Sequence, residues 1–262
     1  MRSVTSRDGT RIAVWQGGAG PALLLVHGAT ADHMTTWRLV SPALERRFTV
    51  YAMDRRGRGD SADGPAYDLQ REAEDVAAVI DSIDAPVNVV GHSYGALCAI
   101  EAARLTGHVR RLILYEGVPL RGEGLYPARI ADRLEALLAA GDVEGMLVAM
   151  YRELVQMPAE ELELLRAQRE AWSRRLTNVA TMPRELRAEQ AYVFRAERFA
   201  GVTAPVLLLV GGDSPPRELL NAEGVAAGLH DARVVLLPGQ QHTAMHTTPE
   251  LFVRTVEAFF LD

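Results

Sequence analysis

Short apolar runs alternate with helical patterns along most of this 262-residue chain. Buried parallel strands appear as continuous runs of branched side chains, and the helices that cross between them show a period of 3.6 residues. Strands are predicted at 3–6, 11–16, 22–26, 48–53, 87–90, 109–115, 205–210 and 233–237, and helices at 34–44, 69–83, 93–105, 217–229 and 249–261. The order predicts an α/β fold, with a mostly parallel twisted sheet and helices on both faces.

The alternation stops after the sixth predicted strand. Between Pro119 and Ala204 no strand is predicted, and four amphipathic helical patterns follow at 126–140, 143–156, 159–175 and 183–194. Such a stretch is longer than ordinary loops. We therefore expect a core domain at 1–118 and 204–262, and an all-helical cap, or lid, at 119–203. Ligands bind such sheets at the carboxyl ends of the strands, where a lid would lie.

Composition excludes several kinds of chemistry. All 28 basic side chains are arginine, so no lysine can form a Schiff base or a P-loop. The lone cysteine, Cys98, excludes an intramolecular disulfide and a cysteine-rich zinc site. Interspersed charges argue against nucleic acid, and the short apolar runs argue against a membrane span or a signal peptide. We expect a cytoplasmic enzyme that binds a small molecule without cofactor or metal, and that can form a homodimer.

The segment 91–95, Gly-His-Ser-Tyr-Gly, joins the predicted strand 87–90 directly to a predicted helix. A serine at such a sharp turn is presented as a nucleophile, and glycines are needed around it because the backbone is crowded. The helix N-terminus adds free N–H groups and partial positive charge beside Ser93. A simple helix N-cap is the alternative role for this serine.

Three more motifs follow strands in a fixed order: His-Gly-Ala at 27–29, Asp-Arg-Arg-Gly-Arg-Gly-Asp-Ser at 54–61 and Gly-Gln-Gln-His at 239–242. With the serine turn and the helical insert, they resemble the α/β-hydrolase family over essentially the whole chain, in its capped, esterase-like serine hydrolase branch. The resemblance implies that Ser93 is the nucleophile and His242 the general base. It also implies an oxyanion hole formed by the backbone N–H groups of Ala29 and Tyr94.

Three alternatives concern the histidines and the arginine-rich motif. His246 lies four residues after His242 and is the alternative base. The two histidines could also pair on a metal ion, although no nearby acidic cluster supports this. The charged segment 54–61 could be an anion site, but a structured loop held by arginine–aspartate pairs is the favoured interpretation.

The acid of the expected triad departs from the family pattern. The family usually carries it three residues beyond the glycine that ends the seventh strand; counted from Gly211, that position holds Ser214, and Asp213 is one residue early. Some members carry the acid after the sixth strand, which here ends in Glu116. We favour Glu116 as the carboxylate that orients His242, and we keep Asp213 as the alternative. A buried salt bridge for Glu116, or a turn cap for Asp213, would explain them otherwise.

The predicted function is hydrolysis of an ester, thioester or lactone of a small, mostly apolar molecule through an acyl-enzyme. His27, Met34, Trp37 and Met245 lie beside the motif loops and are the predicted substrate-binding residues. Carbon–carbon bond hydrolysis, perhydrolase chemistry and a non-hydrolytic cyclase, isomerase or lyase activity on the same scaffold are the alternatives. The absence of lysine argues against the lysine-dependent hydroxynitrile lyases that the resemblance would otherwise include.

Overall fold

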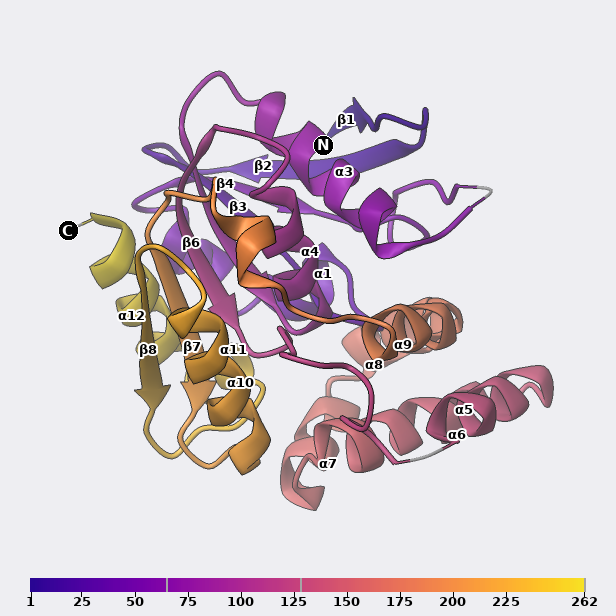
Figure 1. The fold of residues 1–262 in the computed structure, drawn as a ribbon. Helices are drawn as coiled ribbons and strands as arrows, with labels where there is room; N and C mark the ends of the chain where they lie inside the picture. Colours follow the sequence, from indigo (N-terminus) through magenta and orange to yellow (C-terminus); the bar gives the residue numbers. More distant parts are fainter. Residues whose placement is uncertain (65, 128, 262) are drawn as a thin grey trace.

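The computed structural model describes residues 1–64, 66–127 and 129–261. An eight-stranded sheet runs through the molecule in the order β1-β2-β4-β3-β5-β6-β7-β8 (Figure 1). The pairs β1/β2 and β2/β4 are antiparallel and the other pairs are parallel, which confirms the predicted mostly parallel sheet. The strands are β1 (Arg2–Thr5), β2 (Arg11–Gly17), β3 (Ala22–Val26), β4 (Thr49–Met53), β5 (Val87–His92), β6 (Val109–Tyr115), β7 (Val206–Gly211) and β8 (Ala232–Leu237).

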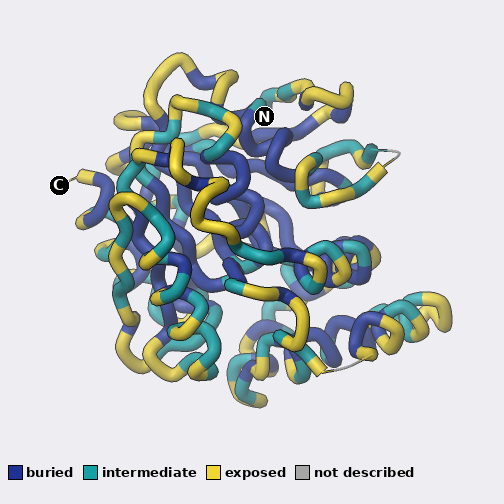
Figure 2. The backbone as a smooth tube through the Cα atoms, viewed as in Figure 1, coloured by how far each residue is buried: buried dark blue, intermediate teal, exposed yellow. Residues whose placement is uncertain are grey.

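Alternate residues of the central strands face two different layers of helices. Leu24 and Val26 of β3 belong to the apolar cluster that includes α3 (Leu69–Asp81), α4 (Tyr94–Ala102) and α10 (Pro216–Ala227). Leu23 and Leu25 belong to the opposite cluster, with α1 (His33–Trp37), α2 (Ser41–Leu44), α11 (Ala244–Thr247) and α12 (Pro249–Leu261). Figure 2 shows the central strands of the sheet mostly dark blue. Burial on both faces confirms the expectation drawn from the apolar runs.

Among the described residues between β6 and β7, the regular elements are helical, and the β-type pairing is an isolated bridge between Arg121 and Val193. Figure 1 shows these helices beside the carboxyl ends of the strands. They share an apolar cluster of their own, which includes Leu134, Leu147 and Leu186. The elements are α5 (Ile130–Ala139), α6 (Val143–Ala149), the π-helical turn η1 (Met150–Val155), α7 (Ala159–Ala167), α8 (Arg169–Asn178), η2 (Val179–Thr181), α9 (Met182–Gln190) and η3 (Ala196–Phe199).

The helical insert thus lies where it was predicted, after the sixth strand, and the separation into two domains stays a prediction. The predicted helix 126–140 includes residue 128, and the predicted core range ends at 262; both positions lie outside the described residues. Of the helices that are described, none is long and apolar enough to span a bilayer.

Candidate active site

The turn between β5 and α4 holds Ser93 in a backbone conformation that side chains rarely adopt, with φ 55° and ψ −132°. Its N–H donates to the carbonyl oxygen of Tyr115 over 2.9 Å, which ties the turn to the neighbouring strand. A Cβ on Gly91 would lie 2.6 Å from the Cα of Ala96, and one on Gly95 would lie 2.3 Å from the carbonyl oxygen of His27. Only glycine fits at either position, so the sequence pattern and the strained serine are consequences of the same crowding.

Two other residues in the left-handed region surround this turn. Thr30 follows β3 with φ 57°, and Glu116 follows β6 with φ 47°. Gly117, with φ 91°, packs so closely that an added Cβ would lie 2.3 Å from the carbonyl carbon of Ser93. Strained backbone of this kind persists where the surrounding structure fixes it, and it gathers at functional sites. The loops after β3, β5 and β6 therefore form one tightly fitted unit.

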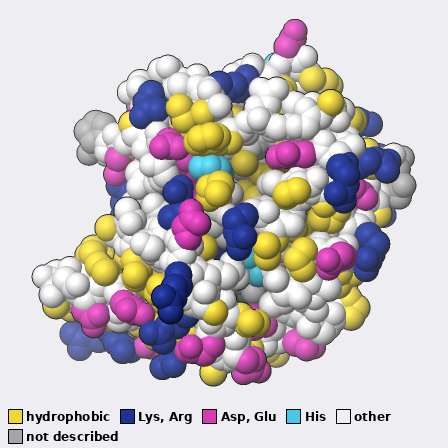
Figure 3. All heavy atoms as spheres, turned by 180° about the vertical axis from the view of Figure 1, so that it is seen from behind, with side chains coloured by type: hydrophobic (Ala, Val, Ile, Leu, Met, Phe, Trp, Pro, Cys, Tyr) yellow, Lys and Arg dark blue, Asp and Glu magenta, His cyan; other side chains and the backbone are white. Residues whose placement is uncertain are grey.

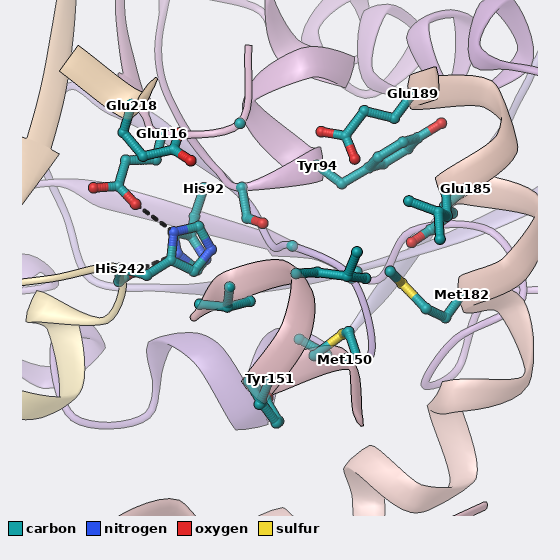
Figure 4. Close-up of a pocket in the computed structure, with 18 of the residues that line it drawn as sticks. His92, Tyr94, Glu116, Met150, Tyr151, Met182, Glu185, Glu189, Glu218 and His242 are labelled. Atoms are coloured by element: carbon teal, nitrogen blue, oxygen red, sulfur yellow. Dashed lines mark hydrogen bonds and ion pairs between the residues drawn. The ribbon is translucent and has the colours of Figure 1, made fainter. Parts of the chain in front are cut away.

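Glu116 and His242 form a direct pair. The Nδ1 atom of His242 lies 2.5 Å from Oε2 of Glu116 (Figure 4). The other carboxylate oxygen, Oε1, accepts hydrogen bonds from the N–H of Gly211 over 2.9 Å and from the hydroxyl of Ser214 over 2.6 Å. Ser214 occupies the position counted for the family's acid, and here it holds the carboxylate that comes from β6 instead. Glu116 is only 7% exposed, so these donors replace its water.

The ionisation of this pair follows from its contacts. Burial alone would raise the pKa of Glu116, but the hydrogen bonds and charge of His242, with the donors Ser214 and Gly211, lower it below its ordinary value. Burial also opposes protonation of His242, yet the hydrogen bond and charge of Glu116 outweigh it and raise the pKa of the imidazole. Glu116 is therefore an anion at neutral pH, which keeps the proton of neutral His242 on Nδ1 and leaves Nε2 as the basic nitrogen.

Asp213 does not join this pair. It is exposed, and its backbone N–H donates to the carbonyl oxygen of Gln240 over 2.9 Å. Within the described residues its carboxylate has neither a hydrogen bond nor an ion pair. The structure thus brings Glu116, and not the alternative acid Asp213, to the imidazole of His242.

Three further histidines lie near the site in different settings. His92 donates from Nε2 to the carbonyl oxygen of His242 over 2.8 Å, and burial with the charge of His242 holds its pKa well below the ordinary value. His27 bonds to the oxygen of Gly28 through Nδ1 and to the N–H of Arg55 through Nε2, so it joins two loops. His246 lines the cavity, and burial and the nearby Arg175 lower its pKa to about 3. His246 has no carboxylate partner among the described residues, unlike His242.

The side chains of Ser93 and His242 line one cavity between the sheet and the helical insert. Ala29 and Tyr94, the predicted backbone donors, line it too. The N–H of Tyr94 lies in the first turn of α4, where no intrahelical acceptor exists. Among the described residues, the Ser93 hydroxyl makes no hydrogen bond.

The four predicted substrate-binding residues do not line this cavity. His27, Trp37 and Met245 are fully buried, the last two in the apolar cluster under α12. Met34 is 38% exposed and faces the outer surface beside Arg38. Proximity to a motif in sequence does not fix the direction of a side chain, because helical residues point to every side of their axis.

The insert, which contains no sequence motif, supplies one side of the cavity wall. Figure 4 shows Met150, Tyr151, Met182, Glu185 and Glu189 reaching toward it from that side. Other lining residues are Thr36, Tyr126, Leu154, Val155, Arg175, Leu186 and Glu218. The wall is thus mixed, with apolar, aromatic and ionisable side chains.

Two of the glutamates in this wall have raised pKa values. Burial raises the pKa of Glu189 to about 7, although the hydroxyl of Tyr126 donates to it over 3.0 Å. Burial and the charge of Glu116 raise the pKa of Glu218, which accepts from Arg217 over 3.0 Å. Both therefore hold protons more readily than exposed glutamates do.

The arginine-rich loop after β4 is held by buried ion pairs, in agreement with the favoured interpretation. Arg55 bonds to Glu72 of α3 over 2.7 Å and to Glu185 of α9 over 2.5 Å, and Arg58 contacts the same two acids. Most of the acids come from helices rather than from aspartates of the loop itself. Arg56 likewise bonds to Asp75 of α3 over 2.7 Å. One cap helix is thereby tied to the core through charges removed from water.

Ionisable groups elsewhere are dispersed. On the face of the described residues seen in Figure 3, acidic and basic side chains lie intermixed rather than gathered into areas of one sign. Within those residues, no three His, Cys, Asp or Glu side chains are grouped in a way that could hold a metal ion.

The family model, the related sequences and the solved structures all point to the same protein family. The model of the alpha/beta hydrolase family matches residues 23–255. A 2-(acetamidomethylene)succinate hydrolase of Mesorhizobium japonicum is 29% identical over 260 residues, which is 92% of this chain and 88% of that protein. A pimeloyl-[acyl-carrier protein] methyl ester esterase of Nitrosomonas europaea is 28% identical over 251 residues, 92% of this chain and 96% of that protein. The crystal structure of an alpha/beta hydrolase from Sphaerobacter thermophilus superimposes with a TM-score of 0.83 at 31% identity, covering 99% of this chain and 100% of that one. The sheet, the strained serine turn and these matches together place the chain in the alpha/beta hydrolase family.

Proposed function

We propose that this protein is a serine hydrolase in which Ser93, His242 and Glu116 form the catalytic triad. The observation that carries the proposal is the pair between Glu116 and Nδ1 of His242, in the same cavity as the strained Ser93. A fixed Nδ1–H leaves Nε2 unprotonated, and this nitrogen can take a proton from a serine hydroxyl. The unbonded hydroxyl of Ser93 closes onto Nε2 when substrate fills the cavity, as catalytic hydrogen bonds often do.

The reaction then proceeds in two steps. The oxygen of Ser93 attacks the substrate carbonyl while its proton passes to Nε2 of His242, and the oxyanion is held by the N–H groups of Ala29 and Tyr94. The histidine gives the proton to the leaving group, and the acyl group stays on the serine. Water, deprotonated by His242, attacks the acyl-enzyme, and the acid product leaves as Ser93 regains a proton.

The bond cleaved is an acyl bond to oxygen or nitrogen. The two relatives, a pimeloyl-[acyl-carrier protein] methyl ester esterase and a 2-(acetamidomethylene)succinate hydrolase, support this range for the present chain. The expectation of a mostly apolar substrate is revised, because glutamates, histidines and an arginine line the cavity together with methionine, leucine and tyrosine side chains. A substrate with both apolar and polar parts suits such a wall better.

The test combines covalent labelling with kinetics. A fluorophosphonate probe should label the wild type at Ser93, and Ser93→Ala should abolish both the adduct and the hydrolysis of a panel of p-nitrophenyl esters graded by acyl length. Thermal unfolding of Ser93→Ala provides the folding control. An intact fold without an adduct at Ser93, or ester hydrolysis that survives in Ser93→Ala, would show that the proposal is wrong.

A further inference from the structure

Among the described residues, Arg175 is a charged side chain of the cavity wall that has no carboxylate beside it. Arg175 of α8 is only 6% exposed and lines the cavity. Its Nη2 donates to the carbonyl oxygen of Thr35 over 3.2 Å, and no carboxylate of the described residues lies within 4.0 Å of its guanidinium nitrogens. A buried guanidinium without a counter-charge is costly, because it has lost water and gained no ion pair.

The other charged groups of the wall already have partners. Glu116 accepts from His242, Ser214 and Gly211. Glu185 is bound by arginines of the β4 loop, Glu218 by Arg217 and Glu189 by the hydroxyl of Tyr126. A ligand would therefore meet an unneutralised positive charge at Arg175 rather than an unpartnered glutamate.

A second polar group near Arg175 also lacks a partner. His246 lines the same cavity, and its Nδ1 is buried without a hydrogen bond among the described residues. Burial and the charge of Arg175 lower the pKa of this imidazole, and both side chains line the same cavity. Thr36, which follows the residue bonded to Arg175, lines the cavity as well. These side chains together offer a cation, a neutral imidazole and a hydroxyl.

We propose that Arg175, with His246 beside it, is a carboxylate-binding subsite, and that the substrates are esters or amides that carry a second, free carboxylate. The inference rests on the proposed function and names its substrate class. A planar carboxylate matches the paired N–H groups of a guanidinium. A phosphate dianion fits less well, because Glu116, Glu189 and Glu218 line the same cavity and only one arginine would oppose them.

Matched substrates test the proposal and locate the carboxylate. Mono-4-nitrophenyl glutarate is compared with 4-nitrophenyl pentanoate, which places the charge on the acyl side. Similarly, 3-carboxyphenyl butanoate is compared with phenyl butanoate, which places it on the leaving-group side. In one of the two pairs, the wild type should favour the charged ester in kcat/KM by about tenfold or more, the range expected of a charge-assisted contact.

Variants then attribute the preference to one side chain. Arg175→Met should bring the ratio of kcat/KM for the charged ester to that for its neutral partner down to about one, and Arg175→Lys should keep part of the preference. Arg169→Met is the matched control, since Arg169 begins the same helix and is exposed. It should retain the full preference.

The outcomes separate this inference from the proposed function. Loss of charged and neutral esterase activity alike in a folded Arg175→Met, or equal use of charged and neutral esters by the wild type, would overturn the subsite. If no ester is cleaved and Ser93 is not labelled, the hydrolase proposal fails. The subsite is still tested, because glutarate should raise the melting temperature of the wild type but not of Arg175→Met. An equal shift in both proteins would refute it.

Discussion

Replacing Glu116 with glutamine gives the sharpest test of the site. The side chains have nearly the same shape, but the amide has one acceptor where the carboxylate has two. In the structure all three neighbours of Glu116 donate: Nδ1 of His242, the N–H of Gly211 and the hydroxyl of Ser214. If the amide NH₂ faces His242, the imidazole must accept at Nδ1 and carry its proton on Nε2. If the amide is flipped, its NH₂ meets the N–H of Gly211.

In the first arrangement Nε2 of His242 carries the proton and cannot act as the base. In the second, two buried N–H donors face each other and neither has an acceptor. An acid-to-amide change in a serine protease triad lowers kcat about 10⁴-fold, which corresponds to about 5.5 kcal/mol of transition-state stabilisation. We expect a loss of about 10³- to 10⁴-fold for Glu116→Gln, and a loss in unfolding free energy of about 1–3 kcal/mol from the unsatisfied donor. The assay is kcat/KM on the ester panel together with urea unfolding.

Asp213→Asn is the matched control, because its carboxylate is exposed and touches none of these groups. It should retain kcat within about twofold, and its stability should be within about 0.5 kcal/mol of the wild type. The reasoning is refuted if Asp213→Asn abolishes kcat while Glu116→Gln barely matters.

Three further outcomes follow from the same loops. Only the neutral imidazole of His242 can accept a proton, and the pKa of this imidazole is raised. The value of kcat/KM should therefore fall with decreasing pH, with a midpoint above the ordinary 6.5 of histidine. A midpoint below 6.5 would contradict this. In urea unfolding, Gly117→Ala should lower the unfolding free energy by about 2 kcal/mol or more beyond the loss in Gly124→Ala. Both glycines have positive φ, but of the two only Gly117 packs against Ser93. Equal losses in the two variants would contradict the packing argument. Cys98 is fully buried, and burial raises its pKa, so Ellman's reagent should react with it only after unfolding; reaction in the native state would be inconsistent with that burial.

Regular elements were predictable where one physical cause dominated. The strands 22–26 and 109–115 coincide with β3 and β6, because β3 is apolar and buried throughout and β6 is apolar and buried over Leu112–Tyr115. The predicted helix 34–44 divides into α1 and α2, with Pro42 in the first turn of the second. Proline lacks an N–H and disfavours a continuous helix there. The predicted helix 159–175 divides at Gln168, where no proline or glycine signals the break.

The sequence predicted the site residues that lie in recognisable motifs, but not those whose role depends on contacts between distant parts of the chain. The serine turn follows from local geometry, which singled out Ser93. His242 was singled out by the resemblance of the Gly-Gln-Gln-His loop and by its place after the last predicted strand. The choice between Glu116 and Asp213 needed the tertiary structure, because the deciding contact joins residues 126 positions apart. Arg175 carried no signal at all, since its significance lies in the absence of a partner, and this depends on every neighbour in space.

The buried ion pairs among Arg55, Arg58, Glu72 and Glu185 also limit which sequence changes the helical insert can accept. If the whole insert were replaced by that of a relative, the new insert would need a carboxylate at the position of Glu185. Without it, two fully buried guanidinium groups would share Glu72 alone, a loss of about 3–5 kcal/mol. Changes of ligand preference should therefore accumulate at single positions facing the cavity, while this electrostatic anchor is inherited intact.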